Sequence, residues 1–575
     1  MNPPLMIITR VLLIGFFICA TALAQSGTFF VGGVWSGNVS PTGATVAVRL
    51  NAASQRVRLV VSENQNLAPA VYSTAVTTSA ASGNTVKLTV QGLNPDTDYF
   101  YGVEVANVLR ADPVSRGRFR TFPLGRASFR IAFASCGDFR QPDQSAYDAI
   151  MRERPLLFIN MGDLHYSDTN STVVEDYRAN YDQVLGHAVQ GALYRSVPLA
   201  YMWDDHDFAG NDSNGNSVGR DTARIAYKER VPHYPLTAPG GTIAQSFTIG
   251  RVRFIMTDLR SAAMDTNLKE SATKTRMGAS QKTWFKQELI NARDGGFPLI
   301  VWVSTMPWIA PAKVGDDTWA GFASERTEIA NFIRDNRIEN IVMLAGDMHG
   351  LAYDDGTHSD YATGGGAPLT VLHAAALTSE PSAKGGPYTA GPLPGSQQYG
   401  ILEVFDNGGA SVACRFQGKK VNEGTKLNHI FSGSAAGAKD HAIVNISTLA
   451  RISAADDTLV SGFVISGASN RSVLIRAIGP TLAAFGVKEA LAQPVLSLFR
   501  GDQVIASNSS WAGMTRAATE VMLDAFDRAG AFRLVDETSR DSSLVMSLAP
   551  GSYTVQVKSG DASLGSTLLE VYDLP

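Results

Sequence analysis

The chain has 575 residues, which is too many for a single hydrophobic core and indicates two to four domains. Hydrophobic residues make up 45% of the sequence and charged residues 18%, a composition that excludes extended disorder. The formal net charge of −4 argues against a nucleic-acid partner, because nucleic-acid-binding proteins carry a strongly basic surface.

The first residues have the pattern of a secretory signal peptide. Arg10 supplies a positive charge, residues 11–22 form an apolar run, and Ala22-Leu23-Ala24 is a small-x-small cleavage site. The apolar run is shorter than the roughly 20 residues that span a bilayer, and no later run is long enough. We therefore expect residues 1–24 to be removed and the protein to be exported to the periplasm, the cell surface or the extracellular medium.

Residues 28–123 are predicted to form a small β-sandwich. Short alternating runs at 45–50, 57–61 and 85–90 are separated by Gly, Pro, Asn and Ser, as expected for strands joined by turns. Tyr99 follows Leu93-Asn94-Pro95 in the manner of the tyrosine corner of fibronectin type III domains. We expect this module to have a structural role.

Residues 126–418 are predicted to form a layered α/β domain with mixed sheets, because strands and helical segments alternate there. The region 246–256 alternates across Gly250-Arg251 and predicts a hairpin. Ser324 is the expected N-cap of the last helix. The helices are expected at 144–152, 173–184, 220–229, 279–291 and 324–335.

The composition changes after Cys414. Residues 419–441 are rich in Gly, Ser, Ala and Lys and are predicted to be a linker. Residues 442–575 have β-type patterns again, at 472–478, 494–499, 552–557 and 568–572. They contain no dense group of His, Cys and carboxylates, so we expect a β-sandwich accessory module that contacts a cell surface or a glycan. The whole chain is therefore predicted to be a multidomain α+β protein.

Four short polar clusters follow apolar runs that are predicted to be buried strands. The runs are 130–134, 156–160, 198–202 and 340–345. The carboxyl edge of an open α/β sheet is where such folds build their sites. Four polar strand ends together therefore predict a polynuclear metal site. The clusters are Ser135-Cys136-Gly137-Asp138, Gly162-Asp163-Leu164-His165-Tyr166, Trp203-Asp204-Asp205-His206-Asp207 and Gly346-Asp347-Met348-His349.

The first two clusters suit a ferric ion. Asp163 is the natural bridging ligand, because each carboxylate oxygen can face a different ion. Tyr166 can bind one of these ions as a phenolate, and Cys136 as a thiolate; both are charged donors suited to iron. The alternative for Cys136 is a disulfide with Cys414, the other cysteine left after signal removal.

The other two clusters complete the predicted site. Asp205 can bind the second ion, and His206 can face the leaving group as an acid. Asp347 and His349 can supply one ligand to each ion. The oxygen donors suit calcium, magnesium or manganese at the second position.

Several further residues are candidates for the surroundings of the site. Arg260 is the first choice for a cation on the nonbridging phosphoryl oxygens and Arg140 is the second. Asp204 is expected to hydrogen-bond to a ligand rather than to bind metal. For His165 a place in the substrate pocket and a structural role are equally open.

This set of motifs resembles the PhoD-type alkaline phosphatases, a group of calcineurin-like metallophosphoesterases. The resemblance covers about residues 28–416 and includes Asp258-x-Arg260 beside the four clusters. It implies a four-layer α/β domain, a β domain in front of it, and a secreted phosphomonoesterase and phosphodiesterase with a ferric ion and calcium. It further implies the ligands: Cys136, Asp163 and Tyr166 on iron, Asp163, Asp205 and Asp347 on the second metal, and His349 on one of the two.

The expected function is therefore hydrolysis of phosphate esters by a metal-bridged hydroxide, with His206 and Arg260 assisting. Zinc, manganese and magnesium remain alternatives to calcium at the second site. A phosphodiesterase or phospholipase preference is the nearest alternative function. A surface-binding protein with a catalytically silent central domain is an alternative of a different class.

Overall fold

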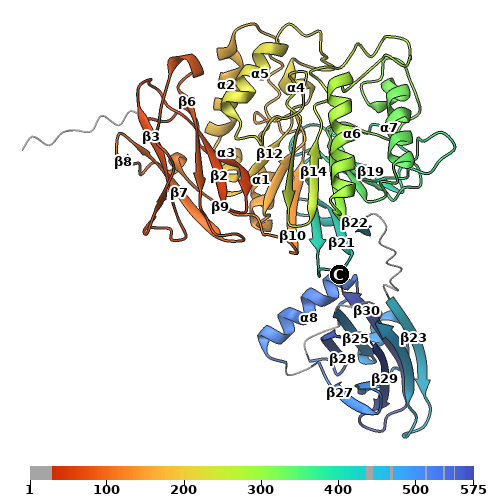
Figure 1. Cartoon of the computed structure of the whole chain (residues 1–575). Coiled ribbons are helices and arrows are strands. Elements are labelled where there is room, and N and C mark those ends of the chain that lie inside the picture. Colours follow the sequence, from red (N-terminus) through yellow and green to blue (C-terminus); the bar gives the residue numbers. More distant parts are fainter. Residues whose placement is uncertain are drawn as a thin grey trace, which may run out of the picture.

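The computed structural model describes residues 29–435, 445–465, 470–511, 514–534, 538–549 and 551–574. The predicted signal peptide lies outside these residues. Figure 1 shows a large body that contains the chain up to β22 and a smaller C-terminal lobe below it. The mixed α/β, multidomain class expected from the sequence is confirmed. No helix in the described part of the chain is long and apolar enough to span a membrane.

The N-terminal module has two sheets, and the three runs predicted as strands lie in β2, β3 and β6. The hydroxyl of Tyr99 accepts a hydrogen bond from the backbone N–H of Asn94 at 2.9 Å, as in a tyrosine corner. One sheet contains six strands: β3 (Arg56–Ser62), β4 (Val71–Tyr72), β5 (Val76–Thr77), β7 (Asp98–Val105), β8 (Val108–Leu109) and β9 (Arg116–Arg120).

The second sheet of this module continues into the central domain. Strands β1 (Trp35–Ser40), β2 (Gly43–Arg49) and β6 (Thr85–Gln91) form one end of a nine-stranded sheet, where β1 pairs in parallel with β12 (Leu199–Tyr201). Gly37 lies opposite Leu199, and a Cβ there would approach the carbonyl oxygens of Leu199 and Pro232 to 2.6 Å. The strands therefore approach this closely because residue 37 is glycine.

Two sheets pack face to face in the large body. The nine-stranded sheet also contains β10 (Phe129–Ala134), β11 (Leu157–Asn160), β20 (Gln398–Phe405), β21 (Ser411–Lys420) and β22 (Gly424–Ser434). The other sheet has the order β13 (Gln245–Ile249), β14 (Val252–Met256), β15 (Leu299–Ser304), β16 (Ile341–Ala345), β18 (Thr370–Ala374), β17 (Gly350–Asp354), β19 (Ala390–Pro394). The predicted hairpin at 246–256 is β13–β14.

Helices lie on the outer faces of these two sheets. Strand β15 shows the arrangement, because Val301 faces the core shared with the other sheet while Trp302 packs in the core with Phe285 of α6. The helices that contribute to the core of the nine-stranded sheet are α1 (Ser145–Glu153), α2 (Val174–Gly186), α3 (Ala188–Ser196) and α5 (Arg220–Arg230). Helices α6 (Ala279–Asp294) and α7 (Ala323–Asp335) cover the seven-stranded sheet.

Two sequence expectations on local structure were wrong, and one helix of the central domain was not expected. Helix α7 begins at Ala323, directly after the 3-10 turn Trp319–Phe322, so Ser324 is not its N-cap. Helix α3 was not expected. The predicted linker at 419–441 instead contains the end of β21 and all of β22, since residues 424–434 pair with β21. Residues 436–444 lie outside the described part.

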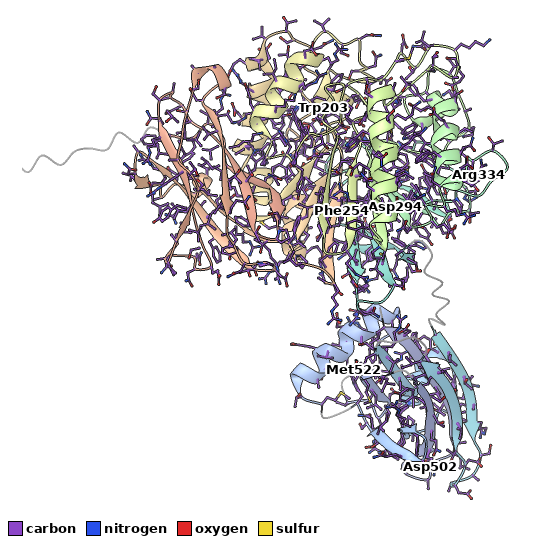
Figure 2. The ribbon with its side chains drawn as sticks, viewed as in Figure 1. Trp203, Phe254, Asp294, Arg334, Asp502 and Met522 are labelled. Atoms are coloured by element: carbon purple, nitrogen blue, oxygen red, sulfur yellow. The ribbon has the colours of Figure 1, made fainter. Side chains whose placement is uncertain are left out.

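The C-terminal lobe has two four-stranded sheets and one helix. The sheet orders are β23-β30-β25-β28 and β24-β29-β26-β27. Met522 of the helix α8 (Arg516–Ala529) lies at the end nearer the large body, and Asp502 in the β26–β27 turn lies at the far end (Figure 2). The helix was not expected. The strands are β23 (Asn445–Ile452), β24 (Leu459–Ile465), β25 (Arg471–Ile478), β26 (Pro494–Arg500), β27 (Gln503–Asn508), β28 (Ser542–Leu548), β29 (Gly551–Ser559) and β30 (Gly565–Leu574).

Candidate metal centre

The four polar clusters follow the carboxyl ends of four strands from the two packed sheets. Cys136 follows β10, Asp163 follows β11 and Asp205 follows β12, which are neighbours in parallel in the nine-stranded sheet. Asp347 follows β16 of the other sheet. Trp203, which precedes the third cluster, is buried inside the large body (Figure 2). The site thus lies where the carboxyl edges of both sheets come together.

One group of donors contains a thiol, a carboxylate and an imidazole. Ligand atoms of Cys136, Asp163 and His349 all lie within 4.8 Å of one another. The Sγ atom of Cys136 lies 3.4 Å from Oδ2 of Asp163. The Tyr166 hydroxyl lies 3.2 Å from Nε2 of His349, so the phenol faces the same group. The backbone carbonyl of Glu380 lies 2.5 Å from Nδ1 of His349, which leaves Nε2 directed at the site.

A second group shares a residue with the first. Asp163, Asp205 and His206 offer ligand atoms within 4.8 Å of one another. Asp163 therefore belongs to both groups, as a bridging carboxylate between two neighbouring ions would. Asp205 in turn lies within the same limit of Asp212 and Asp317, which extends the acidic lining away from Asp163.

Buried carboxylate oxygens in the site fit bound cations. Among the residues that the structure describes, Oδ1 of Asp163 and Oδ2 of Asp347 have no hydrogen-bond partner, although both atoms are inaccessible to solvent. An unpaired carboxylate oxygen in such a place is costly unless a cation satisfies it. The Cys, Tyr, His and carboxylate donors suit iron on one side, and the carboxylates suit a hard cation on the other.

The pKa directions agree with a site built for positive charge. Burial, followed by repulsion from Asp205, raises the pKa of Asp163 well above its usual value. Burial also raises the pKa of the Cys136 thiol, and Asp163 and Asp347 raise it further. A cation between these groups would reverse both effects, because it stabilises the deprotonated forms.

His206 lies beside the candidate metal ligands, next to Tyr166 and Asp168. Its ring stacks on Tyr166 at 4.2 Å, and its Nδ1 lies 2.5 Å from Oδ1 of Asp168. Burial alone would lower the pKa of His206, but Asp163, Asp205 and Asp168 raise it above the usual value. The imidazole is therefore biased toward the protonated form.

Arg260 lies in a different place from the one expected. Its side chain is fully buried and pairs with Asp204 at 2.5 Å, with Asp317 at 2.7 Å and with Asp205 at 3.6 Å. A buried guanidinium with three carboxylates around it cannot reach a substrate in this conformation. We therefore correct the expectation that Arg260 contacts the phosphoryl oxygens. Burial alone would raise the pKa of Asp205, but the charges of Arg260 and His206 lower it to about 2.

The remaining expected residues surround the ligands. Asp204 is buried and accepts from Arg260. The half-exposed Arg140 pairs with Asp138 at 2.8 Å and donates to the backbone carbonyl of Tyr166 at 3.0 Å. His165 is buried, with Nε2 3.6 Å from Asp207, and it packs edge-on to a tyrosine rather than lining an opening.

Two residues of the site, Lys384 and Asp317, were missed by the sequence analysis, and a third, Asp207, was named in the third cluster without a role. Lys384, on the loop after β18, places Nζ 2.6 Å from Oδ1 of Asp347. Asp207 accepts from the backbone N–H groups of Leu164 and His165, and so joins two clusters. Asp317 belongs to a loop before α7. Only Asp207 had a sequence signal, as the third residue after Asp204 in a capping box.

Cys136 and Cys414 are both free and buried. The disulfide alternative for Cys136 is therefore absent from this structure, and the thiol faces Asp163 instead.

Comparisons with known proteins match two adjoining regions of the chain. The family model described as PhoD-like phosphatase matches residues 131–388, and the model described as PhoD-like phosphatase, N-terminal domain, matches residues 19–123. Alkaline phosphatase D of Bacillus subtilis (strain 168) is 25% identical over 326 residues, which are 48% of this chain and 55% of that protein. The match thus spans little more than half the length of this curated relative.

Two solved structures are similar in shape. A structure of PhoD superposes with a TM-score of 0.57 at 20% identity, over 71% of this chain and 91% of that chain, and it shows the shared fold. A purple acid phosphatase from yellow lupin (Lupinus luteus) seeds has a TM-score of 0.48 and 13% identity, over 70% of this chain and 74% of that chain.

Proposed function

Since the chain belongs to the PhoD-like phosphatase family, we propose that it hydrolyses phosphomonoesters, phosphodiesters or both at the candidate metal centre. The observation that carries this proposal is the pair of donor groups that share Asp163. A thiol, a phenol and an imidazole on one side support a ferric ion, and carboxylates on the other support calcium. The apolar run at 11–22 supports export.

The two ions, when bound, would activate the attacking water and would neutralise charge on the phosphoryl group. Cys136, Asp163, Tyr166 and His349 would hold the iron. Asp163, Asp205 and Asp347 would hold the second ion. Arg260 holds Asp204 and Asp205 in place, because it pairs with both, and its charge lowers the pKa of Asp205.

His206 would donate the proton to the leaving oxygen. Asp168 holds Nδ1, so Nε2 is the nitrogen that carries the proton toward the substrate. The raised pKa of His206 keeps this proton available near neutral pH.

Lys384 would bind a nonbridging phosphoryl oxygen. Its side chain is 38% exposed while Asp347 beside it is buried, so part of Lys384 is open to solvent next to a candidate ligand. Arg260 has no such access. The positive charge of Lys384 would then attract the phosphoryl group of the substrate.

The proposal is tested on the full chain, purified without chelators. We expect iron and a second metal by elemental analysis, a visible charge-transfer band, and hydrolysis of p-nitrophenyl phosphate or bis(p-nitrophenyl) phosphate. Asp163→Asn should lose both metals and activity, and Tyr166→Phe should lose the band. Turnover that persists in Asp163→Asn would contradict the assignment of Asp163 as the ligand shared by both ions. The ratio of the two substrates decides between monoester and diester preference.

A second variant separates substrate binding from metal binding. Lys384→Met should retain both metals and lower kcat/KM by about 10- to 100-fold, since a charge-assisted hydrogen bond contributes about 1.5–3 kcal/mol. Lys313→Met is the matched control, because Lys313 is 74% exposed and only loosely paired with Asp316. Unchanged kcat/KM in Lys384→Met would remove this residue from the site.

A further inference from the structure

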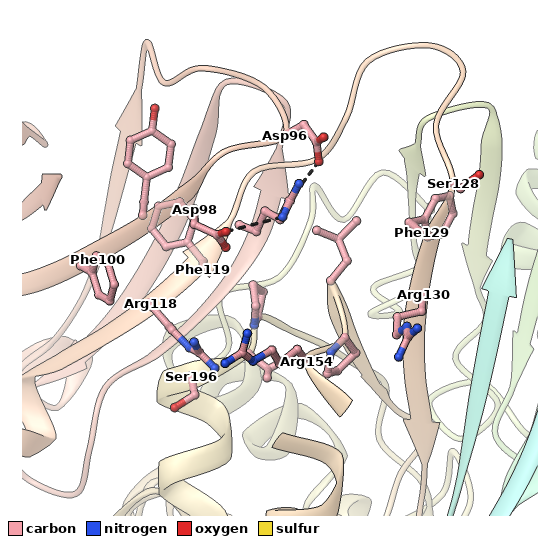
Figure 3. A pocket seen from close by; sticks show the side chains of 16 residues that line it. Asp96, Asp98, Phe100, Arg118, Phe119, Ser128, Phe129, Arg130, Arg154 and Ser196 are labelled. Carbon is pink, nitrogen blue, oxygen red and sulfur yellow. Dashed lines mark hydrogen bonds and ion pairs between the residues drawn. The ribbon is translucent and has the colours of Figure 1, made fainter. Parts of the chain in front are cut away.

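A separate pocket lies at the opposite edge of the nine-stranded sheet (Figure 3). Its volume of about 480 Å³ falls within the range of small-molecule sites, about 300–1,000 Å³. Phe129 at the start of β10 lines it, whereas Cys136 beyond the end of β10 belongs to the metal centre. At about 3.3 Å per residue, this pocket lies on the order of 20 Å from the metal centre.

Two domains form the walls of the pocket. Asp98 of β7 and Arg118 of β9 come from the N-terminal six-stranded sheet. The central domain contributes Arg154, directly after α1, and Ser196 at the end of α3. A ligand bound there would contact both domains. Sites between domains are common places for small ligands.

The pocket is rich in arginine, and two of these side chains lack a partner. Arg120 pairs with Asp96 at 3.0 Å, and Arg130 pairs with Glu403 at 3.2 Å. In contrast, within the described ranges the guanidinium groups of Arg118 and Arg154 make neither a hydrogen bond nor an ion pair. Figure 3 shows these two side chains directed toward each other, next to Ser196.

Two guanidinium groups that face one another without a carboxylate between them repel each other. Arginine presents paired N–H donors that match the oxygens of a phosphate. A phosphate between the two groups would remove the repulsion and could also accept from the Ser196 hydroxyl. Asp96 and Asp98 do not compete for this position, because Arg120 pairs with both.

Most of the remaining lining residues are apolar. Phe129 is half-buried, and Leu156 and Pro198 lie at the starts of the two following strands. Such a wall favours a ligand that has an apolar or aromatic part beside its charged group. Inorganic phosphate alone would leave this wall uncovered.

We propose that this pocket is a second, non-hydrolytic binding site for a small organic phosphate. The phosphate lies between Arg118 and Arg154, and the apolar part lies against Phe129. This inference does not depend on the proposed hydrolysis, because it concerns a different pocket and different residues.

The test is calorimetric titration with phenylphosphonate, which has an aromatic ring and a P–C bond that is not hydrolysed. In full-length Asp163→Asn protein, where metal-dependent binding is removed, we expect one phenylphosphonate per chain. Arg118→Ala and Arg154→Ala in this background should each weaken binding at least tenfold. If Asp163→Asn folds poorly, wild-type protein from which metals are removed with a chelator replaces it, and we expect the same single phenylphosphonate site.

Controls define charge and apolar contributions. The control variant is Arg152→Ala, because Arg152 is an exposed arginine of α1, the helix that ends directly before Arg154, and does not line this pocket. This variant should bind phenylphosphonate as tightly as the protein without the substitution. Inorganic phosphate should bind at least tenfold more weakly than phenylphosphonate. Absence of binding in both Asp163→Asn and stripped protein would overturn the proposal, and so would affinities that do not change in Arg118→Ala and Arg154→Ala. Because no turnover is measured, these outcomes are independent of the phosphatase assays.

Discussion

Four residues of the candidate metal centre have left-handed backbones. The φ angles of Cys136, Asp163, Tyr166 and Asp347 are 62°, 55°, 50° and 61°. Non-glycine residues rarely adopt this region, and each instance costs on the order of 1–3 kcal/mol. The strand ends turn sharply there, and the turns direct side chains of different strands toward one another. Such strain concentrates at functional sites, which independently marks these positions.

A buried histidine outside the candidate metal centre predicts that the fold is sensitive to acid. His373 of β18 is fully buried, and in the described structure neither ring nitrogen has a hydrogen-bond partner. Burial lowers the pKa of His373 from 6.5 to about 3. The unfolded chain therefore binds a proton between these two pH values that the folded chain does not bind.

We expect this difference to destabilise the protein as the pH falls. The stabilising contribution of neutral His373 is complete above pH 6.5 and is lost progressively as the pH falls toward about 3. Lowering the pH to 5 should cost about 2 kcal/mol. Unfolding in urea at pH 7 and pH 5 measures the loss, which His373→Phe should reduce. An equal loss in the variant would show that other groups cause the acid sensitivity.

At the scale of elements, a short helix joins two of the strand ends. Helix α4 (Asp205–Phe208) has Asp204 as its N-cap and Asp207 as its third residue, in a capping box. Asp207 also accepts from the backbone N–H of Leu164 at 2.7 Å. The loop after β11 and the helix after β12 are therefore held together by one buried carboxylate. Gly162 permits the contact, because a Cβ there would lie 2.4 Å from Cβ of Asp204.

Asp207→Ala should loosen both loops at once. Several backbone N–H groups would lose a charged acceptor, so we expect a loss of about 1–3 kcal/mol in the free energy of unfolding. Metal affinity should fall by about 10- to 100-fold, as for groups that orient ligands. Urea unfolding and metal titration measure the two effects. Asp221→Ala is the control, because Asp221 is 70% exposed; a similar loss there would contradict the argument.

At the scale of the molecule, the two flanking modules relate differently to the centre. The N-terminal module shares a sheet with the central domain through β1 and β12. The contacts of the C-terminal lobe include Arg415, which donates to the carbonyl of Asp527, and Arg528, which lies 5.4 Å over Phe405. Removing one part of a shared sheet exposes an unpaired strand edge. Removing a lobe that is held by side-chain contacts at a surface exposes no such edge.

Two truncations should therefore have opposite results. A chain that ends at Ala435 should fold and retain kcat/KM within about twofold, because it keeps both central sheets. Deletion of residues 29–123 should prevent soluble folding, since β12 loses its neighbour and the sheet loses three strands. Circular dichroism, gel filtration and ester hydrolysis measure the outcomes. Loss of activity in the chain that ends at Ala435 would mean that the C-terminal lobe stabilises the candidate metal centre.

The amino-acid sequence by itself determined where the strands end and which polar groups follow them. Continuous apolar runs indicate strands that are buried on both faces. Asp, His, Cys and Tyr directly after such runs indicate a candidate metal site. These local patterns placed Cys136, Asp163 and Asp205 at strand ends before any contact was known. The resemblance of the same motifs to the PhoD-type phosphatases is confirmed by the family models.

Tertiary structure alone decided which of these groups meet. Asp163 and Cys136 meet His349 only because β16 of one sheet ends close to β10 and β11 of the other, and local periodicity does not determine strand order. The burial of Arg260 and the approach of Lys384 depend on loops distant in sequence. The shared sheet depends on Gly37, because a residue with a Cβ at this position would clash with the backbone of Leu199 in β12. Each of these features is a long-range contact, and local sequence patterns carry no information on such contacts.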